Sequence, residues 1–370
     1  MVFCLPAFCC RLLSVGMVFL RVIVSWIYGL VVSVRNMLFD EHILMSYKPS
    51  LPTVCIGNLA MGGTGKTPHT EYLARELSRH YRVAILSRGY KRKTIGFLLA
   101  DDSSTAFTIG DEPMQMHLNL PDVPVAVCEN RIMGIRRLQR LIPDLQLVLL
   151  DDAYQHRRLT CGFYLLLTAA DNLYVNDRFF PIGHLRESKH GSLRANMIVV
   201  TKCSEKMKPI DRRLIETSLH ILPYQTLCFS YLKYGELQPL LTYGRCEGAD
   251  AAQVEIVNDK PLVVTGIENP HPMIDYLQSL GKRVLSLSYS DHHQFTKADY
   301  QKILEMYKAE KCTCIITTQK DAVRMLVSKA LPDEIRNNTL VLPVEIDFKG
   351  QDLSFLKPVM QYVKENNKKK

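Results

Sequence analysis

The chain has 370 residues, of which 47% are hydrophobic and 22% are charged. This composition excludes a largely disordered chain, and the length favours two globular lobes over a single core. The net charge of +9 suits an anionic partner, whether a nucleotide, a nucleic acid or an anionic membrane surface. The 11 cysteines include no C-x-x-C pair, which argues against a zinc site and a disulfide framework and favours a reducing compartment.

The first 34 residues are almost wholly apolar, and no acidic residue precedes Asp40. Arg21 divides two apolar runs at 12–20 and 22–34. A spanning helix needs about 20 apolar residues, and a charge at mid-span costs about 2.5–3.5 kcal/mol. The sequence therefore favours a helix that lies in the membrane interface over a transmembrane anchor.

From residue 25 onward the N-terminal pattern becomes amphipathic. One helical face is apolar and carries Trp26, Leu30, Val34, Met37 and Leu38. The other face carries Ser25, Gly29, Ser33, Asn36 and Asp40. We expect the apolar face to dock on a membrane, with Trp26 and Tyr28 near the headgroups. A helix packed on its own domain remains an alternative.

A glycine-rich segment, residues 57–68, follows a short apolar run at 53–56 and precedes a helical pattern that begins at Tyr72 and Leu73. Strand, glycine-rich turn, Lys-Thr and helix together form the arrangement that cradles nucleotide phosphates. Lys66 would reach the β- and γ-phosphates, and the Thr67 hydroxyl would ligate Mg²⁺. The predicted ATP-binding residues are Ala60, Met61, Gly62, Gly63, Thr64, Gly65, Lys66 and Thr67. A glycine-rich turn that binds nothing is the alternative, since Ala60 stands where the usual motif has glycine.

Two alternations of apolar runs and helical patterns follow. Runs at 83–86, 124–127, 147–150, 163–167 and 197–200, with a helix at 131–141, predict a doubly wound parallel sheet. Strands at 262–266, 284–287, 314–317 and 340–344, with helices at 272–280 and 297–308, predict a second, smaller α/β lobe. We therefore expect an N-terminal membrane-interface region at 1–40, a P-loop nucleotide-binding lobe at 41–205, an irregular linker at 206–258, and the second lobe with the tail at 259–370.

Polar clusters lie at the ends of several predicted strands. Asp151 and Asp152 follow the run at 147–150, where a P-loop protein places the carboxylate that holds Mg²⁺. Asp111 and Glu112 stand in a predicted turn before Pro113, and His292 follows a strand of the second lobe. Each cluster alone is explained by solvated acids or surface histidines. Together they supply what is needed to deprotonate a hydroxyl and transfer a phosphoryl group to it.

The motifs G-N-x-x-x-G-G-T-G-K-T-P, S-R-G-Y, G-D-E-P, D-D-x-x-Q-H and D-H-H occur in this order, and the chain resembles the tetraacyldisaccharide 4′-kinase family, the lipid A 4′-kinases. The resemblance runs from about residue 25 to about residue 324 and accounts for Ala60. It implies ATP-dependent phosphorylation of the 4′-hydroxyl of a lipid-linked tetraacylated glucosamine disaccharide. It also implies a peripheral, monotopic enzyme on the cytoplasmic face of the bacterial inner membrane, with two lobes joined by a short β linker and the active site in their cleft.

The resemblance also implies roles for individual residues. Asp111 and His292 would form the base dyad; because they fall in different predicted lobes, we expect the lobes to close. The residues implied around Mg²⁺ are Thr67, Glu112, Asp151 and Asp152. The residues implied to contact phosphate or the substrate are Arg88, Arg131, Gln155 and His156. ATP and Mg²⁺ are the expected cofactors and the lipid-linked disaccharide and a membrane surface the expected partners, with no nucleic acid and no obligate protein partner.

Two other functions remain open from the residues. A membrane-recruited P-loop ATPase switch of the partitioning or assembly type uses a similar loop, but typically has lysine where this chain has Met61. Such a switch does not need the Gly-Asp-Glu-Pro segment or a histidine pair in the second lobe. A soluble small-metabolite kinase would leave the apolar residues 17–38 unexplained.

Overall fold

The structure is a computed structural model that describes residues 6–244 and 260–367, with side chains described from residue 18. The chain forms two compact units, each assembled from separate stretches of sequence. Unit 1 comprises Met1–Lys66, Asp152–Tyr231 and Gln351–Lys370, and unit 2 comprises Thr67–Asp151 and Leu232–Gly350. The domain boundaries expected from the sequence stay a prediction, and part of the expected linker, 245–259, lies outside the described residues.

Unit 1 contains parallel strands of the larger sheet in the order β1-β6-β7-β8. Their bounds are Thr53–Asn58 for β1, Phe163–Ala169 for β6, Met197–Thr201 for β7 and Thr226–Phe229 for β8. The first three confirm the strands expected from apolar runs, and β1 and β7 are buried along their whole length. Helix α6 (Pro209–Leu219) connects β7 to β8, so residues expected to be irregular continue the sheet.

Shorter elements complete unit 1. The 3₁₀ helices η1 (Tyr174–Asn176) and η2 (Lys189–Arg194) lie in the connection between β6 and β7. The C-terminal helix α11 (Asp352–Asn367) buries Phe355, Val359 and Val363. Its Tyr362 hydroxyl accepts a hydrogen bond of 3.1 Å from the Thr53 backbone N–H, which ties α11 to the start of β1.

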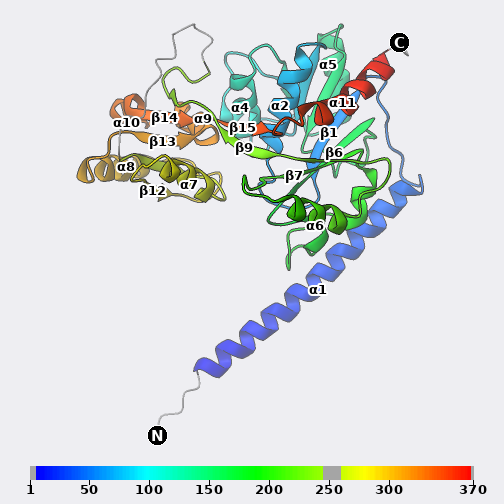
Figure 1. Ribbon diagram of the computed structural model, residues 1–370, viewed down its shortest axis with the longest axis horizontal. Coiled ribbons are helices and arrows are strands. Elements are labelled where there is room, and N and C mark those ends of the chain that lie inside the picture. The colour runs from blue at the N-terminus through cyan, green and yellow to red at the C-terminus, as the bar shows by residue number, and fades with distance from the viewer. Residues whose placement is uncertain (1–5, 245–259, 368–370) are drawn as a thin grey trace. The chain divides into compact units, whose positions relative to one another are not determined.

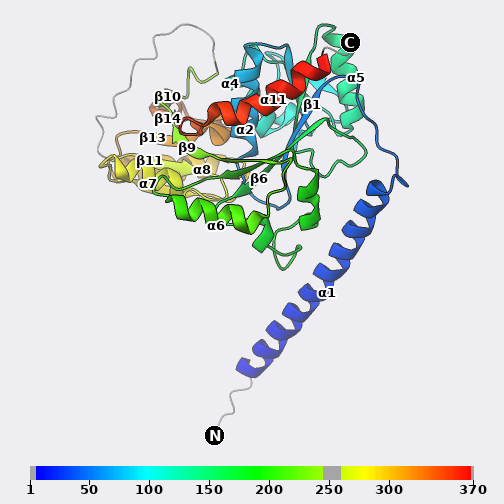
Figure 2. The same cartoon turned by 45° about the vertical axis from the view of Figure 1, so that its right-hand side comes forward.

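Helix α1 spans Pro6–Asp40 and is, within the described part of the chain, the helix whose length and composition would allow it to cross a membrane. Ser25, Gly29, Asn36 and Phe39 are buried. A Cβ on Gly29 would lie 2.7 Å from the Phe179 ring, so this position needs glycine for the close approach. Trp26 is 78% exposed and Leu30 65% exposed, and in both views the N-terminal part of α1 extends clear of the sheet of unit 1 (Figures 1 and 2). The helix therefore packs through its mostly polar face and leaves its apolar face exposed.

Unit 2 begins with helix α2 (Lys66–Ser78), which straddles the boundary between the units, and contains strands in the order β3-β4-β2-β5. Their bounds are Leu98–Leu99 for β3, Val125–Val127 for β4, Val83–Ser87 for β2 and Leu147–Asp151 for β5. Strand β2 pairs in parallel with β4 and β5, whereas β3 is antiparallel at the edge. Helices α3 (Ala106–Ile109), α4 (Asp111–Asn119) and α5 (Arg131–Leu141) connect these strands.

The second sheet, also in unit 2, has the order β10-β14-β13-β11-β12. Its strands are β10 (Gln238–Pro239), β14 (Thr339–Leu342), β13 (Ile315–Thr318), β11 (Leu262–Thr265) and β12 (Leu285–Ser288), all parallel except β10. Its helices are α7 (His271–Ser279), α8 (Lys297–Ala309), α9 (Gln319–Leu326) and α10 (Asp333–Asn338), and β9 (Tyr231–Tyr234) pairs with β15 (Val344–Asp347).

Successive residues of the central strand β11 face opposite sides of this sheet. Leu262 and Val264 belong to a core cluster that includes Tyr300 and Ile303 of α8, whereas Val263 belongs to a cluster that includes Met273 and Leu277 of α7. A sheet buried on both faces is the arrangement predicted from the continuous apolar runs. The fold class is therefore confirmed as mixed α/β, with a large, mostly parallel sheet and a second, smaller sheet.

Candidate active site

The glycine-rich loop lies in unit 1 directly after β1. The Met61 N–H donates to the His184 carbonyl at 2.7 Å, and the Asn58 side-chain amide donates to the Thr64 hydroxyl at 2.9 Å. Gly62 and Gly65 have φ values of 103° and 80°, in the region that favours glycine. These contacts give the loop a fixed curve that ends at Lys66, the first residue of α2.

Lys66 is held between an amide and a carboxylate of unit 1. Its Nζ lies 3.4 Å from the Asn58 Oδ1 and 3.7 Å from the Asp152 Oδ1. The other Asp152 oxygen, Oδ2, accepts a hydrogen bond of 3.3 Å from Arg186 Nη1. Asp152 has a φ of 46°, a left-handed conformation that aspartate tolerates better than most residues. The ammonium group that would bind the β- and γ-phosphates is thus placed by two side chains from separate segments.

Gln155 and His156, both predicted to contact the substrate, occupy different positions in unit 1. The Gln155 amide donates to the Asn58 carbonyl at 2.7 Å and so lies beside the phosphate-binding loop. His156 lines a cavity of about 480 Å³. The other lining residues are Arg35, Phe39, Leu44, Met45, Arg157 and Arg158. This cavity combines cationic and apolar walls and lies at the C-terminal end of α1.

Among the predicted phosphate and metal residues of unit 2, Arg88 and Asp151 lie at the ends of β2 and β5, and Arg131 begins α5. The Asp151 carboxylate accepts hydrogen bonds from the hydroxyls of Ser87 at 3.1 Å and Thr70 at 3.4 Å. Arg131 is 2% exposed and donates to the backbone carbonyls of Cys128 at 2.7 Å and Asp151 at 3.2 Å. Arg88 is exposed at the end of β2. Their contacts to phosphate stay predictions.

Oxygen donors suited to Mg²⁺ are present among the predicted metal residues. Thr67 lies in the first turn of α2 and is half-buried, and the Asp151 and Asp152 carboxylates are the kind of ligand that Mg²⁺ takes in small number beside waters and phosphates. Within residues 6–244 and 260–367, no three His, Cys, Asp or Glu side chains are gathered closely enough to hold a metal by themselves. This chemistry fits a magnesium bound largely through the nucleotide.

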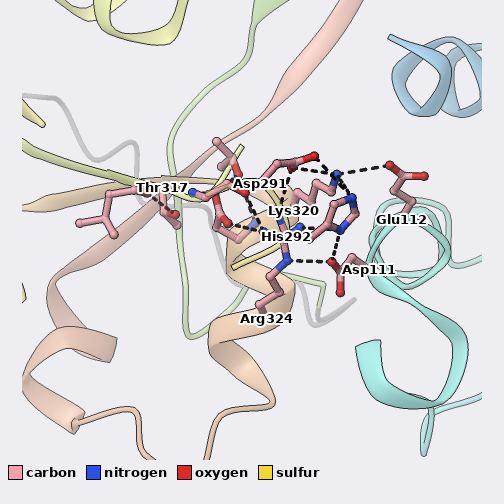
Figure 3. Close-up of polar contacts among 11 residues, drawn as sticks. Asp111, Glu112, Asp291, His292, Thr317, Lys320 and Arg324 are labelled. Atoms are coloured by element: carbon pink, nitrogen blue, oxygen red, sulfur yellow. Dashed lines mark hydrogen bonds and ion pairs between the residues drawn. The ribbon is translucent and has the colours of Figure 1, made fainter. Parts of the chain in front are cut away.

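Asp111 and His292 are in direct contact in unit 2 (Figure 3). The His292 Nδ1 lies 3.0 Å from the Asp111 Oδ2, although the two residues are 181 positions apart in sequence. The two side chains are in contact within unit 2, whereas their role as a base dyad stays a prediction. Gly110-Asp111-Glu112-Pro113 is not the expected turn: Asp111 is the first residue of α4 and is 7% exposed. A helix N-terminus stabilises a carboxylate, and proline is tolerated in the first helical turn.

Arg324 of α9 holds both members of this pair. Its side chain is fully buried; Nε donates to the Asp111 Oδ2 at 2.7 Å, and Nη2 lies 3.2 Å from the His292 Nδ1. Its Nη1 donates to the Asp321 Oδ1 at 2.7 Å. Burial raises the pKa of the Asp111 carboxyl, but the hydrogen bond from His292 and the charge of Arg324 outweigh burial and hold that pKa below its usual value. Asp111 is consequently kept ionised. Burying its charge costs free energy, and the charge of Arg324 offsets that cost.

Lys320, one helical turn before Arg324, contacts the other ring nitrogen of His292. Its Nζ lies 3.1 Å from the His292 Nε2, 3.3 Å from the Glu112 Oε1 and 3.6 Å from the Asp291 Oδ1. His292 is thus contacted at both ring nitrogens, by Lys320 at Nε2 and by Asp111 and Arg324 at Nδ1. His292 has a φ of 60°, a conformation that is uncommon outside glycine and often found at functional sites.

The sequence interpretation did not select Lys320 or Arg324. The available signal was local: Thr318 caps α9 by accepting a hydrogen bond from the Asp321 N–H, and Lys320 and Arg324 are four residues apart on one face of that helix. Nothing in the spacing says that this face meets α4, more than 200 residues earlier in the chain.

Comparison with known proteins identifies the family. The family model described as LpxK, tetraacyldisaccharide-1-P 4′-kinase, matches residues 17–361. The chain belongs to this family. It is 45% identical over 354 residues to the tetraacyldisaccharide 4′-kinase of Bacteroides thetaiotaomicron, with 93% of each chain covered. It is 43% identical over 340 residues to the enzyme of the same name from Flavobacterium johnsoniae, covering 92% of this chain and 95% of the relative.

The predicted resemblance to the lipid A 4′-kinases is thus confirmed, and the chain is an ATP-binding kinase of lipid A biosynthesis. Its fold is similar to that of LpxK from Aquifex aeolicus, solved in complex with ATP, with a TM-score of 0.72 and 24% identity. The match covers 92% of this chain and 98% of the Aquifex chain, so the fold extends over nearly the whole of both.

Proposed function

We propose that this tetraacyldisaccharide-1-P 4′-kinase family member transfers the γ-phosphoryl group of ATP to the 4′-hydroxyl of a tetraacylated glucosamine disaccharide that carries a phosphate at position 1. The observation that carries the proposal is the contact between Asp111 and His292. Lys320 contacts His292, and Arg324 donates a hydrogen bond to Asp111. A buried, ionised carboxylate in contact with a histidine is a suitable acceptor for a hydroxyl proton.

In the proposed reaction the 4′-oxygen bonds to the γ-phosphorus, the bond from that phosphorus to the β,γ-bridging oxygen breaks, and ADP leaves. The hydroxyl proton passes to the Asp111 carboxylate. The depressed pKa of Asp111 suits a loose transition state, in which the attacking oxygen forms little bond before the proton moves. His292 would orient the Asp111 carboxylate through the contact at its Nδ1.

Lys66 would bind the β- and γ-phosphates, where its charge offsets the negative charge of the leaving ADP. Thr67, Asp151 and Asp152 would hold Mg²⁺, which would supply positive charge to offset the charge of the phosphates. Glu112 was predicted to join this set; its contact with Lys320 at 3.3 Å gives it a second possible task, that of placing Lys320 beside His292.

We further propose that the chain works as a peripheral enzyme at the cytoplasmic face of the bacterial inner membrane. An acylated sugar does not readily leave its bilayer, since each buried CH₂ contributes about 0.8 kcal/mol. The exposed apolar face of α1, including Trp26 and Leu30, would dock in the interface. The cavity beside its C-terminal end, with Arg35, Arg157 and Arg158, is suited to the anionic sugar headgroup of the acceptor.

The test is ADP release by the purified chain in detergent micelles, with and without the disaccharide 1-phosphate lipid. The proposal predicts turnover that depends on the acceptor. Acceptor-free turnover that a partner protein stimulates would instead support an ATPase switch of the partitioning type. Turnover with a water-soluble sugar at the same efficiency would contradict the lipid substrate.

A further inference from the structure

We propose that α1 is a working part of the ATP site as well as a membrane-docking helix, and that Asn36 is a positioning residue for Lys66. The proposal rests on the assignment of Lys66 to the ATP phosphates and concerns how that lysine is held. All of its contacts lie within unit 1.

The first link joins α1 to a buried carboxylate. Asn36 is 8% exposed, Glu187 is 1% exposed, and the Asn36 Nδ2 donates to the Glu187 Oε1 at 2.7 Å. Arg194 Nη2 binds the same oxygen at 2.7 Å, so Glu187 is a charged group with fixed partners. Hydrogen bonds to a buried charge are the strong ones, and this bond sets the position of α1 against Glu187.

The second link runs from Glu187 to the phosphate-binding loop. The Gln155 Nε2 lies 3.4 Å from the Glu187 Oε2 and donates to the Asn58 carbonyl at 2.7 Å. The Asn58 side chain then contacts both ends of the loop, through the Thr64 hydroxyl at 2.9 Å and the Lys66 Nζ at 3.4 Å. Four polar contacts therefore connect Asn36 to Lys66 without a gap.

A second route starts from the same face of α1. The Tyr28 hydroxyl donates to the Arg186 carbonyl at 3.0 Å. The Arg186 guanidinium binds the Asp152 Oδ2 at 3.3 Å, and the Asp152 Oδ1 lies 3.7 Å from the Lys66 Nζ. The two neighbours that hold Lys66, Asn58 and Asp152, are thus each connected to α1.

This arrangement gives the unusual polarity of α1 a purpose. Asn36 and Tyr28 make the contacts that lead to the ATP site, while Trp26 and Leu30 remain exposed. Coupling between two sites is reciprocal at equilibrium. Whatever holds α1 in this position favours the Lys66 geometry that binds ATP, and bound ATP must in turn hold α1 in place.

The test measures the Kd for ATP of the full chain in detergent without acceptor, so that membrane docking and lipid binding do not contribute. Asn36→Ala is expected to raise this Kd about 2- to 30-fold, the usual range for coupling through intervening residues. Ser33→Ala, an exposed polar residue on the same helix, is the matched control and should leave the Kd unchanged. Tyr28→Phe, which removes one hydroxyl and preserves the ring, probes the second route and serves as a second variant if Asn36→Ala does not fold.

Two further readouts separate positioning from general destabilisation. If Asn36 acts through Gln155, Asn36→Ala should have little further effect on the Kd for ATP in a Gln155→Ala background. The two substitutions interrupt the same series of contacts, so the second adds little to the first. In turnover assays with detergent-dispersed acceptor, Asn36→Ala should raise the KM for ATP and leave the KM for the acceptor unchanged.

Several results would overturn the proposal. A folded Asn36→Ala variant with wild-type affinity for ATP, an equal loss in Ser33→Ala, or fully multiplicative effects of Asn36→Ala and Gln155→Ala would each do so. Lys66→Ala serves as the reference that does not bind ATP. If wild type binds ATP no better than Lys66→Ala, the assignment of the ATP site itself is wrong.

Discussion

Glu71 of α2 offers a quantitative test of the packing around the helix that follows the phosphate-binding loop. The carboxyl is 4% exposed, and its Oε1 accepts hydrogen bonds from the amides of Gln115 at 3.1 Å and Asn119 at 3.0 Å. Burial raises the pKa of Glu71 from 4.5 to about 7, although the two amide bonds work in the opposite direction. At neutral pH and above, folding must therefore keep an ionised carboxylate in a dry site.

The magnitude follows from linkage. A pKa of about 7 in the folded chain against 4.5 means that the folded state binds this proton more tightly. The contribution of Glu71 to the free energy of unfolding is therefore fully present below the unfolded-state pKa and is lost as pH rises through the folded-state pKa. The total loss is about 3 kcal/mol, at 1.36 kcal/mol per pKa unit. Glu71→Gln does not titrate and keeps an oxygen for both amides, so it should be free of this loss.

The assay is urea unfolding of wild type and Glu71→Gln at matched pH values. We expect the stability of Glu71→Gln relative to wild type to increase by about 2–3 kcal/mol between pH 5 and pH 8, because all other titrating groups cancel in the difference. A difference that does not change with pH would refute the account of Glu71, as would a variant that is less stable than wild type at pH 8.

Three further predictions concern catalysis and membrane binding. Lys66→Ala should abolish phosphoryl transfer with an unchanged unfolding midpoint, and activity within a few-fold of wild type would exclude this loop as the ATP site. Asp111→Ala and His292→Ala should each lower kcat by roughly 10²–10⁴, and the double variant should be little worse than either, whereas multiplicative losses would give His292 an independent task. Trp26→Ala should weaken binding to anionic vesicles, and carbonate should extract the wild-type chain from membranes; retention in the pellet would instead indicate a transmembrane span.

The strands and the phosphate-binding loop could be predicted because their signals are local. Continuous apolar runs predict β1, β2 and β5 to within one or two residues, since a parallel sheet buried on both faces favours apolar residues on both sides of such a strand. The sequence predicts a turn where α4 begins, because glycine and proline flank Asp111 and Glu112. Glycine and proline are common in turns as well as at helix starts. Local pattern does not decide between these two uses.

The cluster around Asp111 was predicted only in part. His292 was expected beside Asp111 from the motif resemblance, but Arg324 and Lys320 were not, since their partners lie far away in sequence and only the packing of α9 on α4 brings them together. The orientation of α1 was likewise beyond the sequence. Its amphipathic pattern predicts one polar and one apolar face, yet the pattern alone does not say that Asn36 and Tyr28 contact Glu187 and Arg186.

The fate of the γ-phosphate tests the central claim most directly. The purified chain would be incubated with γ-³²P-labelled ATP and the disaccharide 1-phosphate lipid, and the lipid product would be separated and its phosphorylated position assigned by NMR. The account predicts that one label is transferred per ADP released and that it resides on the 4′-oxygen, with Asp111→Ala suppressing the transfer. Label released as inorganic phosphate at the same rate with and without the lipid would contradict it.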